Sequence, residues 1–145
     1  MIDIKKKLFS EDDIESFIDL SKSDDLRSEG MRNPEIVKWK FISNPMGPSN
    51  YFFFEVKNKI LGRILSAHFP GKITIKKKIH NSYCLSDFYI DKNYRNLSYL
   101  KSLYSKCLKE TKGIIFHSSN ENSEKFFNKI LNKKIFFNLE SIGLP

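Results

Sequence analysis

The sequence predicts an α/β protein in which helices cover both faces of a mixed, mostly antiparallel central sheet. Runs rich in aromatic and β-branched residues, which favour strands, are separated by runs whose apolar residues recur at helical spacing. The expected order is strand, two helices, three strands, helix, strand, helix and strand. At 145 residues the chain suits one domain spanning 1–145 with a single core, and no linker or internal repeat divides it.

Local signals mark the first strand and the two helices after it. Apolar residues surround three lysines over residues 2–9, which predicts the opening strand. Ser10 is a suitable N-cap for the first helix, because three acidic residues occupy the first turn. Asn33-Pro34-Glu35 begins the second helix, and residues 44–48 end it. The buried face of the first helix is expected to carry Ile14, Phe17, Ile18 and Ser21.

Three strands are expected in the middle of the chain. Residues 51–56 are dense in aromatic side chains and predict a buried strand. Lys57-Asn58 makes the turn, since asparagine tolerates positive φ, and residues 60–68 return as the next strand. Phe69-Pro70-Gly71 is expected to end that strand, and residues 82–90 form the third.

The C-terminal part of the chain predicts two more helices and two more strands. Residues 97–109 have helical periodicity, and residues 114–116 form a short buried strand. Ser119 or Asn120 caps the next helix, and residues 134–139 form the last strand. The core-facing stripe of the 97–109 helix is expected to comprise Leu97, Leu100, Tyr104, Cys107 and Leu108.

The chain is basic, with a formal net charge of +8, which suits nucleic acid, anionic lipid or an acidic cofactor. The lysines are spread from end to end, with tight clusters only at residues 5–7 and 76–78. Both clusters fall in strand-like segments, where lysines commonly protect a sheet edge from aggregation. No nucleic-acid-binding motif accompanies them, so we expect a solvated face and no nucleic acid partner.

Other classes of protein are disfavoured by what the sequence lacks. Cys84 and Cys107 are too few for a disulfide framework, and no secretory signal opens the chain. No apolar run reaches the ~20 residues that span a bilayer. We therefore expect a cytoplasmic protein without membrane insertion. There is no HExxH or paired CxxC motif, so no metal site is expected.

Residues 87–100 are the stretch with the most functional content. They predict a strand that ends, turns sharply and opens a helix. At such a junction the first backbone N–H groups of the helix point beyond the strand, where a phosphate can bind.

Four patterns follow one another along the chain. Residues 55–62 form a hairpin that ends in glycine, and residues 88–95 form a strand followed by an arginine. A helix comes next, and residues 120–127 are an Asn-led helix that ends in an aromatic pair. Together these patterns resemble the GNAT superfamily of acyl-CoA-dependent N-acyltransferases, whose fold agrees with the expected order of elements.

The resemblance implies that acetyl-CoA, or another acyl-CoA, is the co-substrate and that it lies along the strand at Tyr89 and Ile90. Asn120 is implied as a further cofactor-binding residue. The family's pyrophosphate loop has two glycines followed by a glycine or alanine, at alternate positions, because close approach of the phosphates leaves little room for side chains. In this chain the implied loop consists of Arg95, Asn96, Leu97, Ser98, Tyr99 and Leu100.

Acetyl transfer to an amine needs a base for the ammonium proton and an acid for the leaving thiolate. Phe127 stands where many family members have a tyrosine as the acid, and phenylalanine cannot donate a proton. The candidates for proton transfer are Asp87 and Glu55, on strands that would line the acceptor side, and His117, which follows the short strand 114–116.

The function expected from the resemblance is N-acyltransfer from acyl-CoA to a small amine or amino sugar. The alternative is a degenerate GNAT fold that serves as a recognition or assembly module without catalysis, which Leu100 and Phe127 favour. Family members usually close with two strands after the last helix, whereas this chain offers one. A homodimer or a second domain is therefore expected to complete the sheet.

Overall fold

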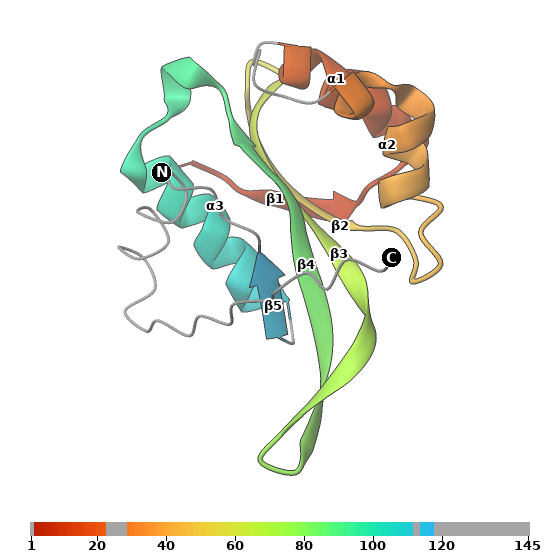
Figure 1. The fold of residues 1–145 in the computed structure, drawn as a ribbon. Helices are drawn as coiled ribbons and strands as arrows, with labels where there is room; N and C mark the ends of the chain where they lie inside the picture. The colour runs from red at the N-terminus through yellow and green to blue at the C-terminus, as the bar shows by residue number, and fades with distance from the viewer. Residues whose placement is uncertain (1, 23–28, 112–113, 118–145) are drawn as a thin grey trace.

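A computed structural model describes residues 2–22, 29–111 and 114–117, which form a twisted sheet flanked by helices (Figure 1). The strands of this part of the chain are β1 (Lys5–Leu8), β2 (Asn50–Val56), β3 (Lys59–Ile75), β4 (Lys78–Ile90) and β5 (Ile114–His117). The α-helices are α1 (Ile14–Lys22), α2 (Pro34–Phe41) and α3 (Leu97–Glu110), and the 3-10 turns are η1 (Glu11–Asp13), η2 (Glu29–Arg32) and η3 (Lys92–Tyr94). The helix expected after Asn120 and the strand expected over residues 134–139 lie outside the described residues.

The strands are arranged in the order β1-β2-β3-β4-β5. Neighbours from β1 to β4 are antiparallel, and β4 and β5 are parallel. The parallel pair arises because α3 carries the chain back along the sheet between these two strands. The predicted mixed, mostly antiparallel sheet is confirmed.

Helices cover both faces of the sheet, as predicted. Figure 1 shows α1 and α2 on one side and α3 on the other. Successive side chains of β2 point to opposite faces of the sheet and so contribute to both hydrophobic cores. Tyr51 and Phe53 face α1 and α2, while Phe52 and Phe54 face α3. Each of these four side chains is buried.

The starts of α1 and α2 follow the sequence signals. The Ser10 backbone N–H and hydroxyl both donate to Asp13 Oδ2, each at 3.0 Å, at the start of η1, the 3-10 turn that leads directly into α1. Asn33 Oδ1 accepts from the Glu35 N–H at 2.9 Å, with Pro34 at the first helical position. These caps fix where each helix begins and therefore how it lies on the sheet.

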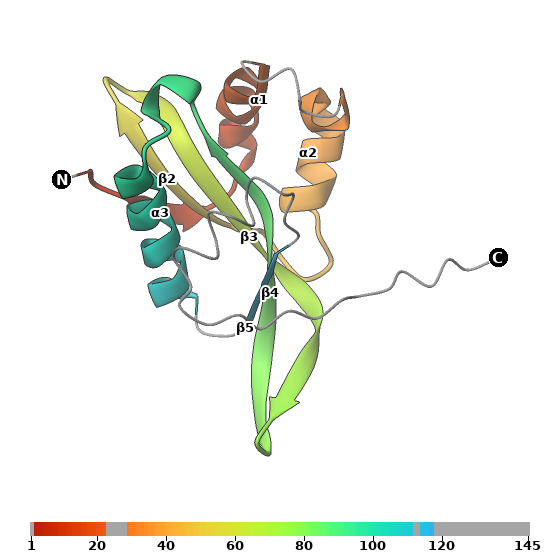
Figure 2. The ribbon, with the colours of Figure 1, turned by 60° about the vertical axis from the view of Figure 1, so that its left-hand side comes forward.

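The prediction that Phe69-Pro70-Gly71 ends a strand is wrong. The β3–β4 register passes from Phe69–Ser82 to Lys72–Asn81, so residues 70 and 71 form a bulge within one long hairpin. A bulge tolerates proline because its residues make no regular ladder bonds. The hairpin arm extends beyond the rest of the sheet (Figures 1 and 2), and its turn is Lys76-Lys77, at φ 48° and 64°.

Candidate active site

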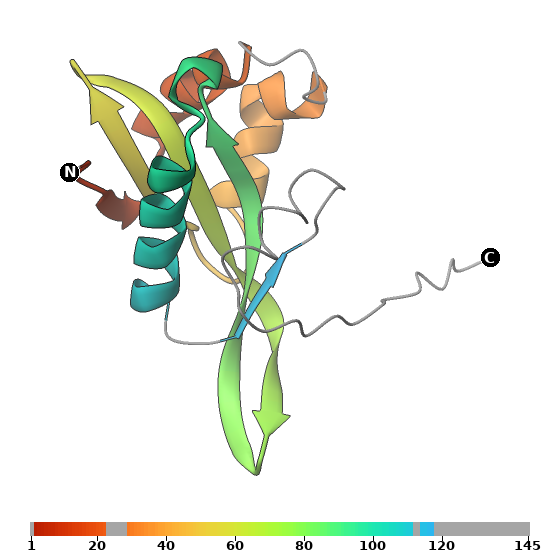
Figure 3. The same cartoon turned by 90° about the vertical axis from the view of Figure 1, so that its left-hand side faces the viewer.

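The junction of β4 and α3 has the predicted strand-turn-helix form (Figures 2 and 3). After Ile90, the Asp91 side chain accepts from the Asn93 N–H at 2.9 Å and caps η3. Asn96 is the N-cap of α3, and its Oδ1 accepts from the Tyr99 N–H at 3.0 Å. Hydrogen bonds from short polar side chains therefore stabilise both turns. The loop of the family that the sequence resembles has glycines instead.

Next to this junction, β4 continues beyond its pairing with β5. β5 pairs with Ser82–Leu85 and, in the described part of the chain, no strand pairs with that side of β4 between residue 86 and Ile90. Figure 3 shows β4 continuing past the end of β5. This last part of β4 leads directly into the turn before α3.

Strand alternation determines to which side the backbone groups of β4 point. The Asp91 N–H donates to the Leu61 carbonyl on β3 at 2.8 Å, so the backbone groups of Tyr89, two residues earlier, also point toward β3. Those of Phe88 and Ile90 point away from β3, toward the side of β4 on which β5 lies. A ligand that hydrogen-bonds on this side of β4 would therefore use the backbone of Ile90 rather than that of Tyr89.

Arg95 lies at the end of β4. Its Nε donates to the Ile90 carbonyl at 2.8 Å, and its guanidinium carbon is 5.6 Å from the centroid of the Tyr89 ring. The residue is exposed. A guanidinium held there can receive an anion that occupies the turn.

The first turn of α3 offers further donors. The first N–H groups of a helix have no acceptor within the helix, and Asn96 satisfies only that of Tyr99. Among the described residues, no group accepts from the N–H of Leu97 or Ser98. These two amides and the positive end of the helix dipole suit a phosphate.

Leu100 replaces the last small residue of the family loop. Its side chain is half-buried and packs against the core between α3 and the sheet. The expected alternative role of Leu100, as a core residue of the helix, therefore fits the structure. The side chain is directed at the core, so its bulk does not by itself close the first turn to a ligand.

Asp87 lies on β4, three residues before the strand ends. It is 6% exposed, and its Oδ2 accepts from Arg63 Nε at 2.6 Å. Its carboxylate is thus neutralised by a buried guanidinium.

The other two candidates for proton transfer lie on different strands. Glu55 is half-buried on β2 and forms an ion pair with Lys5. His117 ends β5 and is in register with Leu85 on β4; the placement of its side chain is outside the description. Asp87 and His117 therefore come from neighbouring strands, while β3 separates Glu55 from them. Asn120 lies outside the described residues.

Arg63 was missed by sequence reasoning. It is 0% exposed on β3 and contacts Asp87 and α1. A single arginine within the apolar run of residues 60–67 was the available signal, because a charge buried in a strand needs a partner.

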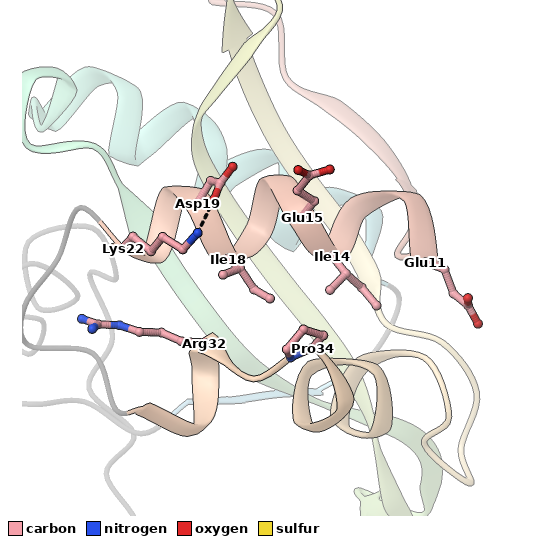
Figure 4. A pocket seen from close by; sticks show the side chains of 8 residues that line it. All are labelled: Glu11, Ile14, Glu15, Ile18, Asp19, Lys22, Arg32 and Pro34. Carbon is pink, nitrogen blue, oxygen red and sulfur yellow. Dashed lines mark hydrogen bonds and ion pairs between the residues drawn. The ribbon is translucent and has the colours of Figure 1, made fainter.

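A groove of about 470 Å³ lies between α1 and the segment from η2 to α2 (Figure 4). None of its lining residues belongs to β4 or α3. Asp19 pairs with Lys22 at 2.8 Å, and Glu11 pairs with Lys38 at 2.7 Å and raises the pKa of that lysine. The groove is lined by Glu11, Ile14, Glu15, Ile18, Asp19, Lys22, Arg32 and Pro34.

Within the described segments, no three of the residues His, Cys, Asp and Glu gather closely enough to hold a metal ion. None of the helices there has the length and apolar character needed to cross a bilayer.

The strand order, the parallel β4–β5 pair and the helices on both faces of the sheet define the class of fold. It is that of the GNAT acetyltransferases, as the resemblance implied, and solved acetyltransferase structures match nearly the whole chain. No protein-family model matches the sequence. No curated protein matches it either.

Three of the similar structures illustrate the match. A predicted acetyltransferase from Clostridium acetobutylicum, solved with acetyl-CoA, has a TM-score of 0.66 at 14% identity, covering 97% of this chain and 95% of that one. Ribosomal-protein-alanine N-acetyltransferase from Brucella melitensis biovar Abortus 2308 has a TM-score of 0.66 at 13% identity, covering 97% and 99%. An aminoglycoside acetyltransferase from an uncultured soil metagenomic sample, solved with sisomicin, has a TM-score of 0.63 at 15% identity, covering 98% and 97%. At these identities the likeness establishes the fold.

Proposed function

We propose that this protein is an N-acetyltransferase that moves the acetyl group of acetyl-CoA to a small amine, in a cytoplasmic setting. The observation that carries the proposal is the end of β4 beyond its pairing with β5, which runs into a helix N-terminus beside Arg95. The amides of Leu97 and Ser98, which have no acceptor among the described residues, the backbone of Ile90 and the exposed guanidinium fit the amide groups and pyrophosphate of an acyl-CoA. A solved neighbour that contains acetyl-CoA supports the same assignment.

The reaction is a direct transfer between two bound substrates. The neutral amine nitrogen attacks the thioester carbonyl carbon, the C–S bond breaks, and CoA leaves as a thiolate that takes up a proton. The proton lost from nitrogen passes to a base. His117, Asp87 and Glu55 remain the proposed groups for proton transfer. Of these three groups, the two carboxylates are held in ion pairs, Glu55 with Lys5 and Asp87 with Arg63.

The proposed acceptor is a small amine or an amino sugar. Support comes from the neighbour solved with sisomicin, an aminoglycoside. Sisomicin and simple polyamines are therefore suitable first acceptors to test. A homodimer is also proposed, and light scattering at high protein concentration tests it: a strictly monomeric protein would contradict it.

The second candidate function is a recognition or assembly module with the same fold and no catalysis. The self-capping of Asn96, which occupies the Tyr99 N–H, favours it. Under this alternative neither acetyl-CoA nor a CoA analogue binds.

Calorimetric titration with acetyl-CoA and desulfo-CoA separates the two functions. The enzyme is expected to bind both, and Arg95→Glu is expected to weaken binding at least tenfold, which corresponds to about 1.4 kcal/mol. Lys109→Glu is the matched control, since this exposed residue lies in the last turn of α3 and the net charge changes equally. Failure of both ligands to bind at millimolar concentration would exclude the enzyme.

A further inference from the structure

The β3–β4 hairpin ends in an arm, residues 67–81, which projects from the sheet at the end opposite to α1 (Figures 1 and 2). Among the described strands, β2 pairs with β3 only as far as Ser66, and β5 begins to pair with β4 at Ser82. The arm is therefore a two-stranded ribbon. Such a ribbon is marginally stable in water unless another surface packs against it.

The arm is basic throughout. It contains four lysines and no acidic residue, and the chain has no aspartate or glutamate between Glu55 and Asp87. The three lysines at the tip, residues 76–78, are exposed, and Ile79 next to them is 67% exposed. A surface that fits this tip combines acidic groups with an apolar contact.

An acidic surface lies along η1 and α1, at the other end of the molecule (Figure 1). Residues 11–22 include five acidic residues and a single lysine. Four of the five acidic residues are exposed, and they are Glu11, Asp12, Glu15 and Asp19. Opposite charges thus occupy opposite ends of the molecule, where they can meet between two copies of the chain but not within one.

The groove of about 470 Å³ beside α1 adds an apolar contact to this acidic surface. Ile14 and Ile18 are directed from α1 toward η2 and α2 (Figure 4). Glu11 lies at one end of the groove, and the two basic residues Lys22 and Arg32 lie at the other. A basic segment is therefore expected to enter at the end where Glu11 lies.

Glu15 is the acidic residue of the groove that is best able to receive a lysine. Glu11 pairs with Lys38 at 2.7 Å, and Asp19 pairs with Lys22 at 2.8 Å. Among the described residues, Glu15 forms no such ion pair, and its side chain is exposed. A lysine from another molecule can therefore approach Glu15 without displacing a cation of the same chain.

We propose that the tip of the arm of one copy lies in the groove beside α1 of a second copy, with its lysines at Glu15 and Ile79 on the apolar floor. Because the arm and the groove lie at opposite ends, two copies related by a two-fold axis make this contact twice. Each copy has a net charge of +8, but repulsion between distant exposed charges is screened beyond about 8 Å at physiological salt. Nucleic acid phosphates would attract the lysines but would leave the acidic groove without a partner.

The inference rests on the homodimer of the proposed function and gives that dimer its interface. It makes no use of the acyl-CoA site. Lys78 begins β4 and Ile90 ends it, so the tip of the arm lies roughly 40 Å from that site. Charge changes in the arm should therefore leave acetyl-CoA binding unchanged.

The test uses two charge reversals, Lys78→Glu in the arm and Glu15→Lys in the groove. Either variant alone places like charges together at both contacts of its homodimer. In a mixture of the two variants, the reversed arm meets the reversed groove at one contact, and the native arm meets the native groove at the other. Lys109→Glu is the matched control, because this exposed lysine on α3 undergoes the same charge change away from the arm.

Sedimentation equilibrium measures the dimer dissociation constant, and thermal unfolding checks that each variant is folded. We expect a dimeric wild type and a dissociation constant at least tenfold higher for either reversal, since two contacts per dimer become repulsive. The mixture of the two reversals should dimerise within about threefold of the wild-type affinity. Lys109→Glu should behave as the wild type, and its addition should leave the Glu15→Lys protein monomeric.

A wild type that is monomeric at high concentration would overturn the inference, and so would Lys78→Glu and Glu15→Lys proteins that stay monomeric when mixed. A dimer that Lys78→Glu weakens no more than Lys109→Glu has its interface elsewhere. If a monomeric wild type binds duplex DNA and Lys78→Glu abolishes that binding, nucleic acid replaces the second copy as the partner.

Titration of the same proteins with acetyl-CoA separates this inference from the proposed function. Normal acetyl-CoA binding by a monomeric wild type refutes the interface alone. A dimer restored by mixing, in a protein that binds no acetyl-CoA, refutes the acetyltransferase and leaves the interface standing.

Discussion

Gly62 shows how one residue without a side chain shapes the site. A Cβ built on Gly62 would lie 2.1 Å from Cε1 of Phe54, because the aromatic ring of Phe54 lies directly over the glycine. The same ring contacts the Tyr99 ring edge-on, with centroids 5.7 Å apart. The hairpin glycine is therefore required by close packing beneath the first turn of α3.

We predict that Gly62→Ala destabilises the protein by about 1–3 kcal/mol, since the buried Phe54 ring must move. Urea unfolding monitored by the fluorescence of Trp39, which is 68% exposed, measures the change. Gly30→Ala is the control, because its Cβ would meet only Ile36 Cδ1 at 3.7 Å. Equal stability of the two variants would contradict the packing argument.

Individual residues on α3 were predicted less well than the helix itself. Leu103, Tyr104 and Cys107 are buried, whereas Leu97 is 46% exposed and Leu108 36% exposed. The predicted buried face of α3 was thus slightly rotated from the observed one, and Leu103 was missed. Periodicity identifies an apolar face, but the sheet decides which edge of that face is covered.

Among the elements, the N-terminus of α3 is the central part of the candidate site. Asn96 caps the helix through the same backbone N–H that a glycine would leave available to a pyrophosphate. Under the proposed function, helix capping and phosphate binding would compete for the Tyr99 N–H.

Asn96→Gly is expected to strengthen acetyl-CoA binding severalfold, since it frees this donor, and to cost only a few tenths of a kcal/mol in helix stability. Calorimetry measures the affinity. Asn96→Ala also frees the donor but keeps a Cβ in the turn, so its gain in affinity should be smaller, with a loss of helix stability of about 1 kcal/mol. An Asn96→Gly protein that binds acetyl-CoA no better than wild type would show that the N–H of Tyr99 takes no part.

The long hairpin could not be deduced from local signals. Pro70-Gly71 is typical of a strand end, and Lys76-Lys77 is not a typical pair for a turn with positive φ. Cross-strand pairing with residues 78–82 holds both segments in the ladder despite these preferences. This pairing depends on contacts between the two strands, and the local preferences of single residues do not indicate those contacts.

At the scale of the whole molecule, two separate cores hold the helices to the two faces of the sheet. The core beneath α3 contains two titratable groups. Burial raises the pKa of Cys107 from 9.0 to about 11 and that of Tyr104 from 10.0 to about 12. Both groups are neutral acids whose charged forms the core disfavours.

The contribution of these two groups to the free energy of unfolding should therefore be constant below pH 9. It should fall as the pH rises above 9. The unfolded state releases its thiol proton there, while the folded state retains it up to about pH 11. The Cys107 contribution is on the order of 2 kcal/mol by pH 10.5. Urea unfolding at pH 8 to 10.5 should show a shallower decline for Cys107→Ala than for wild type, and parallel declines would refute the assignment.

The sequence by itself determined the order of elements, the caps of α1 and α2, the two-faced sheet and the junction at residues 87–100, because these depend on periodicity and on local hydrogen bonds. It also identified the resemblance that implied the acetyltransferase fold. Only the tertiary structure decided that Asp87 is the partner of Arg63, that Leu100 packs into the core and that, among the described residues, no strand pairs with β4 on the β5 side after Leu85. Each of these results from contacts between residues brought together by strand register and helix packing, which a single sequence does not specify, whereas the Asn96 cap of α3 is a local hydrogen bond.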